Sequence, residues 1–316
     1  MRILLAAVFC CLAAAPALAQ PFEVVGSRAL GMAGAFVAVA DDATGVYWNP
    51  AGLASGQPAG AIVEWHRFRS GDPDAIPVSG PWKRTAGLMS LGTWPIGVSI
   101  ARIEEVRLVD GNTAERFSTR QYGLSMLQTL TEGVVIGATL KYVRGDVIQA
   151  PITGETVDEA LDEGFGFAGD SQGAFDLDLS AMYDAQVFRL GVTMRNARSP
   201  TFSGAGDVRR ELTRHTRVGL AVLPTDGLTL ALDVDLDTAD RPTGEQRMLA
   251  AGAEYQVSTR IVVRGGARRN LEGTRETVGA AGASLVLRPG TWLDGHLTFG
   301  RSTAERAFGL ALRAGW

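Results

Sequence analysis

Cysteine is almost absent from the sequence: of its 316 residues only Cys10 and Cys11 carry a thiol, and both lie near the start. The apolar run Ile3–Ala14, followed by the small-residue triplet Ala17-Leu18-Ala19, predicts a secretory signal peptide that is cleaved after Ala19. The exported chain would then have no thiol, which excludes a disulfide, a catalytic thiolate and a cysteine-ligated metal. A lipid anchor on either cysteine is the less favoured alternative, because both stand inside the apolar run.

Long hydrophobic runs and an excess of basic residues are also missing. No stretch of ~20 apolar residues follows the signal peptide, and the mean hydropathy is only +0.08, which excludes a helical membrane protein. Removing Arg2 leaves 29 basic against 34 acidic side chains, a net charge of −5, and this balance argues against nucleic acid as a partner. The 39 glycines are too many for a helical bundle and are typical of a chain rich in turns and strands.

In place of long apolar runs, the sequence has a hydrophobicity pattern with a period of two residues. From residue 59 onward, segments of about ten residues alternate apolar and polar positions, as strands with two different faces do. In the clearest segment, 228–237, every second residue is apolar, Leu232 among them, while Asp233 and Asp235 stand on the other face. A soluble sandwich would show the same alternation, so the pattern identifies strands without placing them in a membrane.

The connections between these segments favour the membrane. Short connections alternate with long ones along the chain, as expected when short periplasmic turns alternate with longer outer loops. We therefore predict an all-β fold, a transmembrane antiparallel up-and-down β-barrel of about fourteen strands with an N-terminal plug segment in the lumen. The expected strands are 61–69, 84–93, 96–109, 116–130, 134–148, 174–183, 187–195, 211–223, 228–237, 246–256, 259–268, 272–287, 292–301 and 305–315.

The last of these segments has apolar residues at every second position and closes on an aromatic side chain. The residues are Phe308, Leu310, Leu312, Ala314 and Trp316. We interpret them as a closing strand that faces outer-membrane lipid and as a barrel-insertion signal, which the barrel-assembly machinery would capture by strand addition.

The segment before the barrel is rich in glycine and irregular. The expected division is a signal peptide at 1–19, a plug at 20–58 and the barrel at 59–316. The plug cannot cross lipid with its backbone unsatisfied, yet its apolar side chains need burial, which the lumen would provide. We expect the Asn49-Pro50 pair to force a turn, and Asp41 or Asp42 to pair with Arg189 or Arg264. The proposed gating motif comprises Asp41, Asp42, Trp48, Asn49, Pro50 and Gly52. Whether the segment gates the pore or only starts barrel closure stays open.

Polar residues on the expected inner faces are interpreted as a hydrated lining of the lumen. They are Asp176, Asp178, Arg189, Arg195, Asp233, Asp235, Arg264 and His296. Calcium at Asp233 and Asp235 is the alternative, but the glycine and the distal glutamate of an EF-hand loop are missing. The three histidines lie on different expected strands without metal-ligand spacing, so we expect no metal and no cofactor.

Two short motifs suggest enzymes, but their surroundings do not fit. Residues 164–169 match the dinucleotide fingerprint without the strand before it and the helix after it. Residues 169–173 match a nucleophile elbow, with Asp294 and His296 as triad partners by chain order, but a strand is expected to follow instead of a helix. We therefore expect no catalytic residue, and a surface hydrolase is the least favoured class. The acidic stretch 149–173 is interpreted as a solvated loop, with contact to divalent ions that bridge lipopolysaccharide as the alternative.

The N-terminal segment also carries a family resemblance. Residues 26–36, 40–44 and 48–53 resemble the opening of mature proteins of the FadL/PorV superfamily. The later stretches 174–177, 189–192, 195–196 and 252–255 look like the PorV/PorQ branch. The resemblance implies an outer-membrane barrel of fourteen strands with a plug in its lumen. FadL-like members pass hydrophobic compounds such as long-chain fatty acids, whereas PorV-like members serve type IX secretion.

The sequence therefore leaves two functional hypotheses open. The leading one is passive passage of a hydrophobic or amphipathic small molecule through the outer membrane of a Gram-negative-type bacterium. The alternative is a PorV-like, non-enzymatic scaffold for an exported protein partner. A continuous apolar path through the lumen would favour transport, and a filled polar interior would favour the scaffold.

Overall fold

The computed structural model describes residues 22–205, 208–241, 244–300 and 305–316. The predicted signal peptide, its cleavage site after Ala19 and both cysteines lie outside the described residues. Among the described residues, no helix has the length and apolar character needed to cross a membrane.

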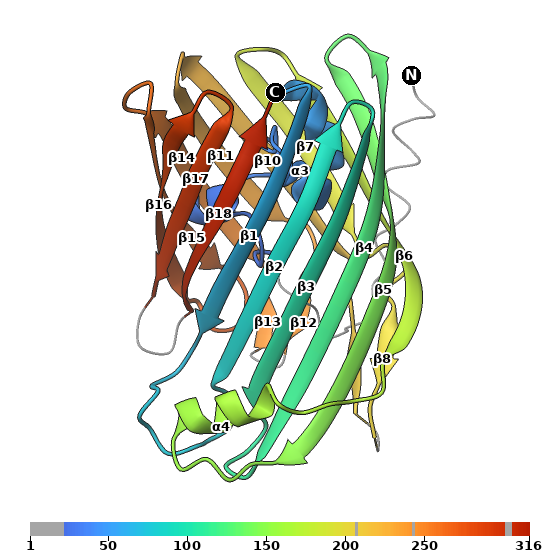
Figure 1. Cartoon of the computed structure of the whole chain (residues 1–316), viewed down its shortest axis with the longest axis vertical. Coiled ribbons are helices and arrows are strands. Elements are labelled where there is room, and N and C mark those ends of the chain that lie inside the picture. The colour runs from blue at the N-terminus through green and yellow to red at the C-terminus, as the bar shows by residue number, and fades with distance from the viewer. Residues whose placement is uncertain (1–21, 206–207, 242–243, 301–304) are drawn as a thin grey trace.

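Fourteen strands in the described part of the chain form one closed antiparallel barrel, which confirms the predicted fold (Figure 1). Each strand pairs with the next one of the barrel along the chain, and the first pairs with the last in register from Gly60 opposite Gly315 to Arg69 opposite Arg306. The strands are β1 Ala59–Arg69, β2 Trp82–Thr93, β3 Ile96–Leu108, β4 Thr113–Thr131, β5 Val134–Pro151, β6 Gln172–Asp184, β7 Phe188–Arg195, β10 His215–Thr225, β11 Leu228–Asp235, β14 Met248–Gln256, β15 Ile261–Asn270, β16 Thr277–Arg288, β17 Thr291–Phe299 and β18 Arg306–Gly315.

The two faces of the wall differ as the alternation predicts. Leu232 points outward and is 47% exposed, whereas its neighbour Asp233 points inward and is 1% exposed. An exposed apolar or aromatic side chain occurs on every barrel strand, for example Val63, Leu91, Val98, Leu124, Leu140, Leu179, Leu190, Leu220, Leu232, Tyr255, Val263, Leu285, Leu297 and Leu310. This continuous outer band is the surface that a barrel presents to lipid.

Two long connections contain small hairpins that the sequence did not indicate. Strands β8 Thr201–Ser203 and β9 Arg209–Glu211 pair with each other, as do β12 Ala239–Arg241 and β13 Gly244–Gln246. The strand expected at 211–223 therefore begins only at His215, because Glu211 belongs to β9. The strand expected at 272–287 likewise begins at Thr277.

The acidic stretch 149–173 is not simply a solvated loop, since it contains helix α4 Val157–Gly164. Thr156 and Glu159 form a reciprocal capping box at its start, a sequence signal that the charge of the stretch obscured. Its apolar face packs on Val106 and Leu108, which point to the lipid-facing side of β3 near the long-loop end (Figure 1). On its polar face, Asp158 and Asp162 lie 2.6 and 2.7 Å from the ammonium group of Lys83.

Candidate functional site: the plugged lumen

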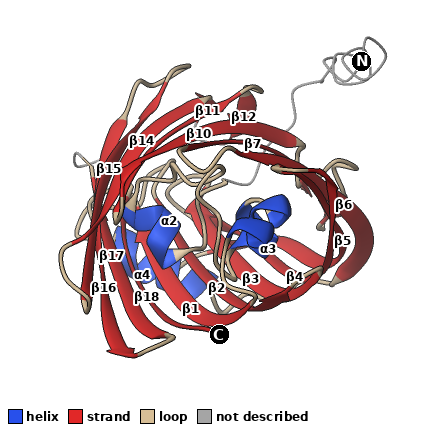
Figure 2. Cartoon of the chain, turned by 90° about the horizontal axis from the view of Figure 1, so that it is seen from above, coloured by secondary structure: helices blue, strands red, loops and turns tan. Residues whose placement is uncertain are grey.

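The segment before β1 lies inside the barrel (Figure 2). It contains helices α2 Ser27–Gly31 and α3 Gly45–Trp48 and the 3-10 helix η1 Pro50–Ser55. Nearly every residue from Phe22 to Gly52 is buried, and Trp48 forms the centre of the segment. The indole N–H of Trp48 donates to the carbonyl of Val25 at 3.1 Å, and the Phe22 and Phe36 rings pack on it with centroids 5.0 and 5.8 Å away. We call residues 22–58 the plug.

Inward-facing glycines let the plug backbone lie directly against the wall. A β-carbon at Gly219 would come within 2.9 Å of the Ala38 nitrogen, and one at Gly252 or Gly266 within 2.6 Å of the Met32 carbonyl oxygen. Gly282 similarly faces Gly31 at 3.0 Å. Since real β-carbons do not approach backbone this closely, larger residues here would push the plug out of place.

Two buried wall carboxylates hold backbone N–H groups of the plug. Glu64 on β1 accepts from Gly26 and Ser27 at the start of α2, at 2.5 and 3.0 Å. On the other side of the lumen, one oxygen of Asp233 accepts from Phe36 and Val37 at 2.9 and 2.8 Å. Charge-assisted hydrogen bonds of this kind are stronger than neutral ones, so both sites anchor the plug. Asp233 thus lies on the inner face of the wall, as expected, and there it contacts the plug backbone.

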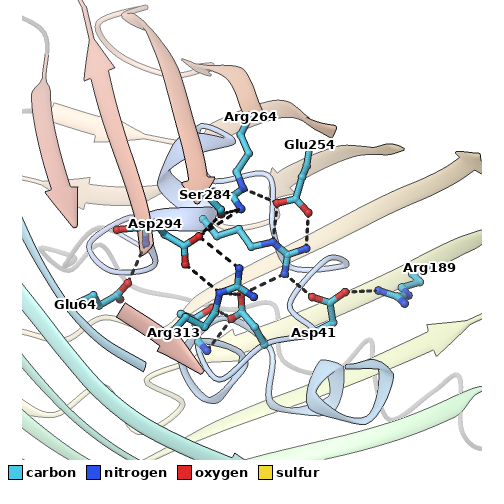
Figure 3. A network of polar contacts seen from close by, with 12 residues as sticks. Asp41, Glu64, Arg189, Glu254, Arg264, Ser284, Asp294 and Arg313 are labelled. Atoms are coloured by element: carbon cyan, nitrogen blue, oxygen red, sulfur yellow. Dashed lines mark hydrogen bonds and ion pairs between the residues drawn. The ribbon is translucent and has the colours of Figure 1, made fainter. Parts of the chain in front are cut away.

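Arg28 of the plug is the centre of an ion-pair network that includes Asp41 and Glu254 (Figure 3). Its guanidinium nitrogens lie 2.5 Å from Asp41, 3.2 Å from Asp42 and 2.7 Å from Glu254 on β14. Burial raises the pKa of Asp42, but the guanidiniums of Arg28 and Arg313 outweigh this and hold the pKa below its usual range. Asp42 is therefore a carboxylate at neutral pH and ties the plug to the wall.

The network continues into the wall on both sides. Asp41 lies 3.1 Å from Arg189 on β7, one of the two partners considered for it. The other, Arg264, pairs instead with Glu254 at 2.5 Å. Arg313 lies 3.9 Å from Asp42 and 3.0 Å from Asp294 of β17 (Figure 3). Acidic and basic side chains of the plug and the wall thus alternate in one connected network of ion pairs.

The remaining inner-face residues also lie in the lumen, in pairs. Asp176 and Asp178 lie 3.0 and 2.7 Å from the Lys141 ammonium group. Arg195 stacks on Tyr47 of the plug, with its guanidinium carbon 3.5 Å from the ring centroid. Asp235 lies 2.6 Å from Arg217.

The histidines and the gating-motif residues occupy buried places as well. His296 packs on His66 with ring centroids 5.1 Å apart. Within the plug, the Asn49 amide donates to the Val37 carbonyl at 2.8 Å, and Pro50 starts η1. Gly52 lies so close to Ala40 that a β-carbon would come within 2.3 Å of its carbonyl oxygen, so no larger residue fits there.

The end of the barrel with the long loops contains a cavity of about 490 Å³. Its wall is amphipathic: Trp82, Met248 and Val278 contribute apolar surface, whereas Arg84 and Arg268 contribute charge. Both arginines are paired with carboxylates, Arg84 with Glu105 and Arg268 with Glu305. The plug contributes Glu23 to the lining, so it separates this cavity from the end with the short turns.

The loop between β7 and β10 fills another part of the same end. Phe202 of β8 packs on Val143 of β5 and on Leu212, and a β-carbon at Gly145 would meet its ring at 2.7 Å. Arg210 of β9 pairs with Glu115 on the inner face of β4. The cavity of about 490 Å³ is lined instead by residues of β2, β3, β14, β15 and β16 and of the loops beside them.

The closing strand faces as its pattern predicts: Phe308, Leu310 and Leu312 are 45, 59 and 52% exposed, and Trp316 is 63% exposed. The two enzyme-like motifs have no matching context, since residues 164–169 begin at the last residue of helix α4 and residues 169–173 lead into β6. Within the described ranges no group of three or more His, Cys, Asp or Glu side chains is placed to hold a metal ion.

Solved structures of membrane channels are similar to this chain. The CymD monoaromatic hydrocarbon channel matches with a TM-score of 0.69 at 15% identity, over 94% of this chain and 99% of that one. The Ralstonia pickettii toluene transporter TbuX gives 0.66 at 14% identity, over 93% and 99%. A Pseudomonas aeruginosa FadL homologue gives 0.65 at 10% identity, over 94% and 99%.

The fold is that of FadL-like outer-membrane channels. Two of these structures are named as a monoaromatic hydrocarbon channel and a toluene transporter, and what this chain shares with them is the closed barrel of fourteen strands. A family model described as "F plasmid transfer operon, TraF, protein" matches residues 114–235, less than half of the chain. No curated protein matches the sequence.

The FadL-like barrel can be oriented from its connections. Residues 94–95, 132–133, 226–227 and 289–290 make short turns at one end, whereas 70–81, 152–171 and 196–214 are long connections at the other. Short turns face the periplasm in such barrels and long loops face outward. The 490 Å³ cavity therefore opens on the outer side, and Asp41 and Asp42 lie at the periplasmic side near Trp94 and Trp292.

Proposed function

We propose that the protein is a plugged outer-membrane channel that admits a small hydrophobic or amphipathic molecule through its outer cavity. The observation that carries the proposal is the amphipathic cavity of about 490 Å³, which is bounded below by the plug. Cavities of ~300–1,000 Å³ are the usual size for small-molecule sites. Because the arginines in its wall already pair with carboxylates, the cavity suits an uncharged apolar molecule or one with a single polar group.

The names of the similar structures support the same class of substrate, because two of them are a monoaromatic hydrocarbon channel and a toluene transporter. The plug blocks the direct route to the periplasm, so passage requires it to move. Its anchors at Glu64 and Asp233 are hydrogen bonds that can break and reform, which is compatible with a gate.

The test is accumulation of radiolabelled toluene by cells that produce the intact protein or a cavity variant. Val278 lies on the inner face of β16 and lines the cavity, so Val278→Trp fills part of it. Ala283 lies on the outer face of the same strand, and Ala283→Trp is the matched control. We expect the intact protein and Ala283→Trp to accelerate accumulation and Val278→Trp to lose most of the effect. Equal rates with and without the protein would overturn the proposal.

A second candidate, a PorV-like scaffold for an exported protein, is favoured by the filled interior. Below the cavity the lumen is filled by the plug and by the paired charges around Arg28 and Arg217. Cells that lack the protein would distinguish the two functions. Loss of specific surface proteins with unchanged entry of hydrophobic molecules would favour the scaffold, and the reverse result would favour the channel.

A further inference from the structure

Three arginines form a row across the outer face of neighbouring strands. Arg102 of β3 lies directly opposite Arg120 of β4, and Arg120 lies directly opposite Arg144 of β5. All three are exposed. Like charges in direct register destabilise an antiparallel pair, so the row is unfavourable unless an anion neutralises it.

The described protein neutralises only one end of this row. Arg102 lies 2.8 Å from Glu104, whereas neither Arg120 nor Arg144 has an ion pair or hydrogen bond from its side chain to any described residue. The nearby carboxylates are engaged elsewhere: Glu104 also lies 2.5 Å from Arg116, and Asp146 lies 2.7 Å from the same guanidinium. Four guanidiniums thus face two carboxylates, and the surface has a net charge of +2.

The row begins where the lipid-facing band ends. Tyr122 of β4 and Tyr142 of β5 lie two positions closer to the periplasmic end than Arg120 and Arg144. Tyr122 pairs in register with Tyr142, and Tyr142 pairs with Phe175 of β6. Their rings stack along the wall, with centroids 6.5 Å apart between the tyrosines and 5.2 Å apart between Tyr142 and Phe175. Aromatic side chains of this kind mark the margin of the hydrocarbon in membrane barrels. The arginines therefore stand at the height of the outer-leaflet headgroups.

A neutral donor extends the row to β6. Gly173 is the register partner of Arg144, and a β-carbon on it would come within 2.4 Å of the Tyr142 hydroxyl oxygen. The phenol of Tyr142 therefore leans over Gly173, which places its hydroxyl beside the arginine row while its ring stays on the aromatic margin.

We propose that this surface is a binding site for the phosphate groups of an outer-leaflet glycolipid, a bisphosphorylated lipid A. Guanidinium groups present paired N–H donors that match phosphate oxygens, and Arg120 and Arg144 have all of theirs available. The stacked rings of Tyr122, Tyr142 and Phe175 lie on the membrane side of the arginines, where the acyl chains of the same lipid would contact them. The site is independent of transport, since it lies on the outside of the wall.

Native mass spectrometry of the full-length mature protein with synthetic hexa-acylated lipid A tests this site. The variant is Arg120→Gln/Arg144→Gln, and the control is Arg260→Gln/Arg288→Gln, which removes the same charge from exposed positions at the periplasmic end. We expect the test variant to bind bisphosphorylated lipid A about tenfold more weakly for each arginine removed, because hydrogen bonds to charged groups contribute on that scale. The control should bind like the intact protein.

Two further arms separate the lipid from other anions. Dephosphorylated lipid A with the same acyl chains should bind the intact protein no better than it binds the test variant, and excess inorganic phosphate should not displace the lipid. Equal binding by the test and control variants would overturn the proposal, as would displacement by inorganic phosphate or binding of an acidic peptide in preference to the lipid. Heat-modifiable gel migration of both variants shows that they fold.

Discussion

Leu232 and Asp233 are neighbours in the sequence and have opposite surroundings. The leucine is exposed on the lipid-facing side of β11, and the aspartate accepts two N–H groups of the plug on the other. A one-residue shift of register would exchange them, which is why alternation fixes the facing of a strand so strongly. The facing of each residue can therefore be tested by a separate substitution.

Leu232→Arg should lower the free energy of unfolding in lipid vesicles by about 2–4 kcal/mol, as expected for arginine on the lipid face near the bilayer midplane. Leu236 is the control, because it lies two outward-facing positions further toward the outer end of the barrel. Leu236→Arg should cost only about 0–1 kcal/mol, since the cost of a lipid-facing arginine falls near the interface. Denaturant titration of folding into vesicles measures both values. A Leu232→Arg variant as stable as the intact protein would show that this face does not meet lipid.

Asp42 gives the plug a predictable dependence on pH. Its pKa in the folded protein is lowered, so the stability that it contributes is present above the ordinary aspartate pKa of about 3.9 and is lost as the pH falls below that value. Relative to Asp42→Asn, the intact protein should be more stable by about 1.5–3 kcal/mol at neutral pH.

That difference should stay constant down to about pH 4 and shrink below it. Denaturant titrations across the pH range measure the difference. A constant gap between the two proteins down to pH 2 would contradict the role of Asp42.

Among the elements, helix α4 shows how a local signal was masked by composition. The six acidic residues of 149–173 suggested a solvated loop, yet Thr156 and Glu159 form a capping box and Val157, Ala160 and Leu161 pack on the outside of β3. The spacing of the threonine and glutamate was visible in the sequence. What the sequence could not show is the surface that the helix covers, because Val106 and Leu108 are about fifty residues away and read as ordinary strand residues.

Thr156→Ala should loosen α4 without affecting the barrel. Loss of an N-cap side chain costs about 0.5–2 kcal/mol, so amide hydrogens of residues 157–164 should exchange up to about thirtyfold faster. Ser258→Ala in a periplasmic turn is a control outside the helix. Unchanged exchange in α4, or faster exchange in β3 and β4 as well, would contradict this assignment.

At the scale of the whole molecule, the wall was predictable and the interior was not. Alternation and turns predicted all fourteen strands, because each depends on residues adjacent in sequence. The plug contacts join distant residues: Arg28 and Glu254 are 226 positions apart, and nothing local identifies them as partners. Among the residues that contact the plug, Glu64 was the most predictable from the sequence, because it is an acidic residue on the inner face of the first strand.

The central claim is that the plug closes the barrel between the outer cavity and the periplasm. Planar-bilayer conductance of the intact protein and of a chain lacking Val25 to Asp42 tests it most directly, since the deletion spares the turn into β1 and removes the contacts of Arg28, Phe36 and Val37. Heat-modifiable migration of the deleted chain establishes that the barrel has formed. We expect the intact protein to be nearly silent and the deleted chain to conduct steadily. Equal conductance of the two folded proteins, open or closed, would contradict it.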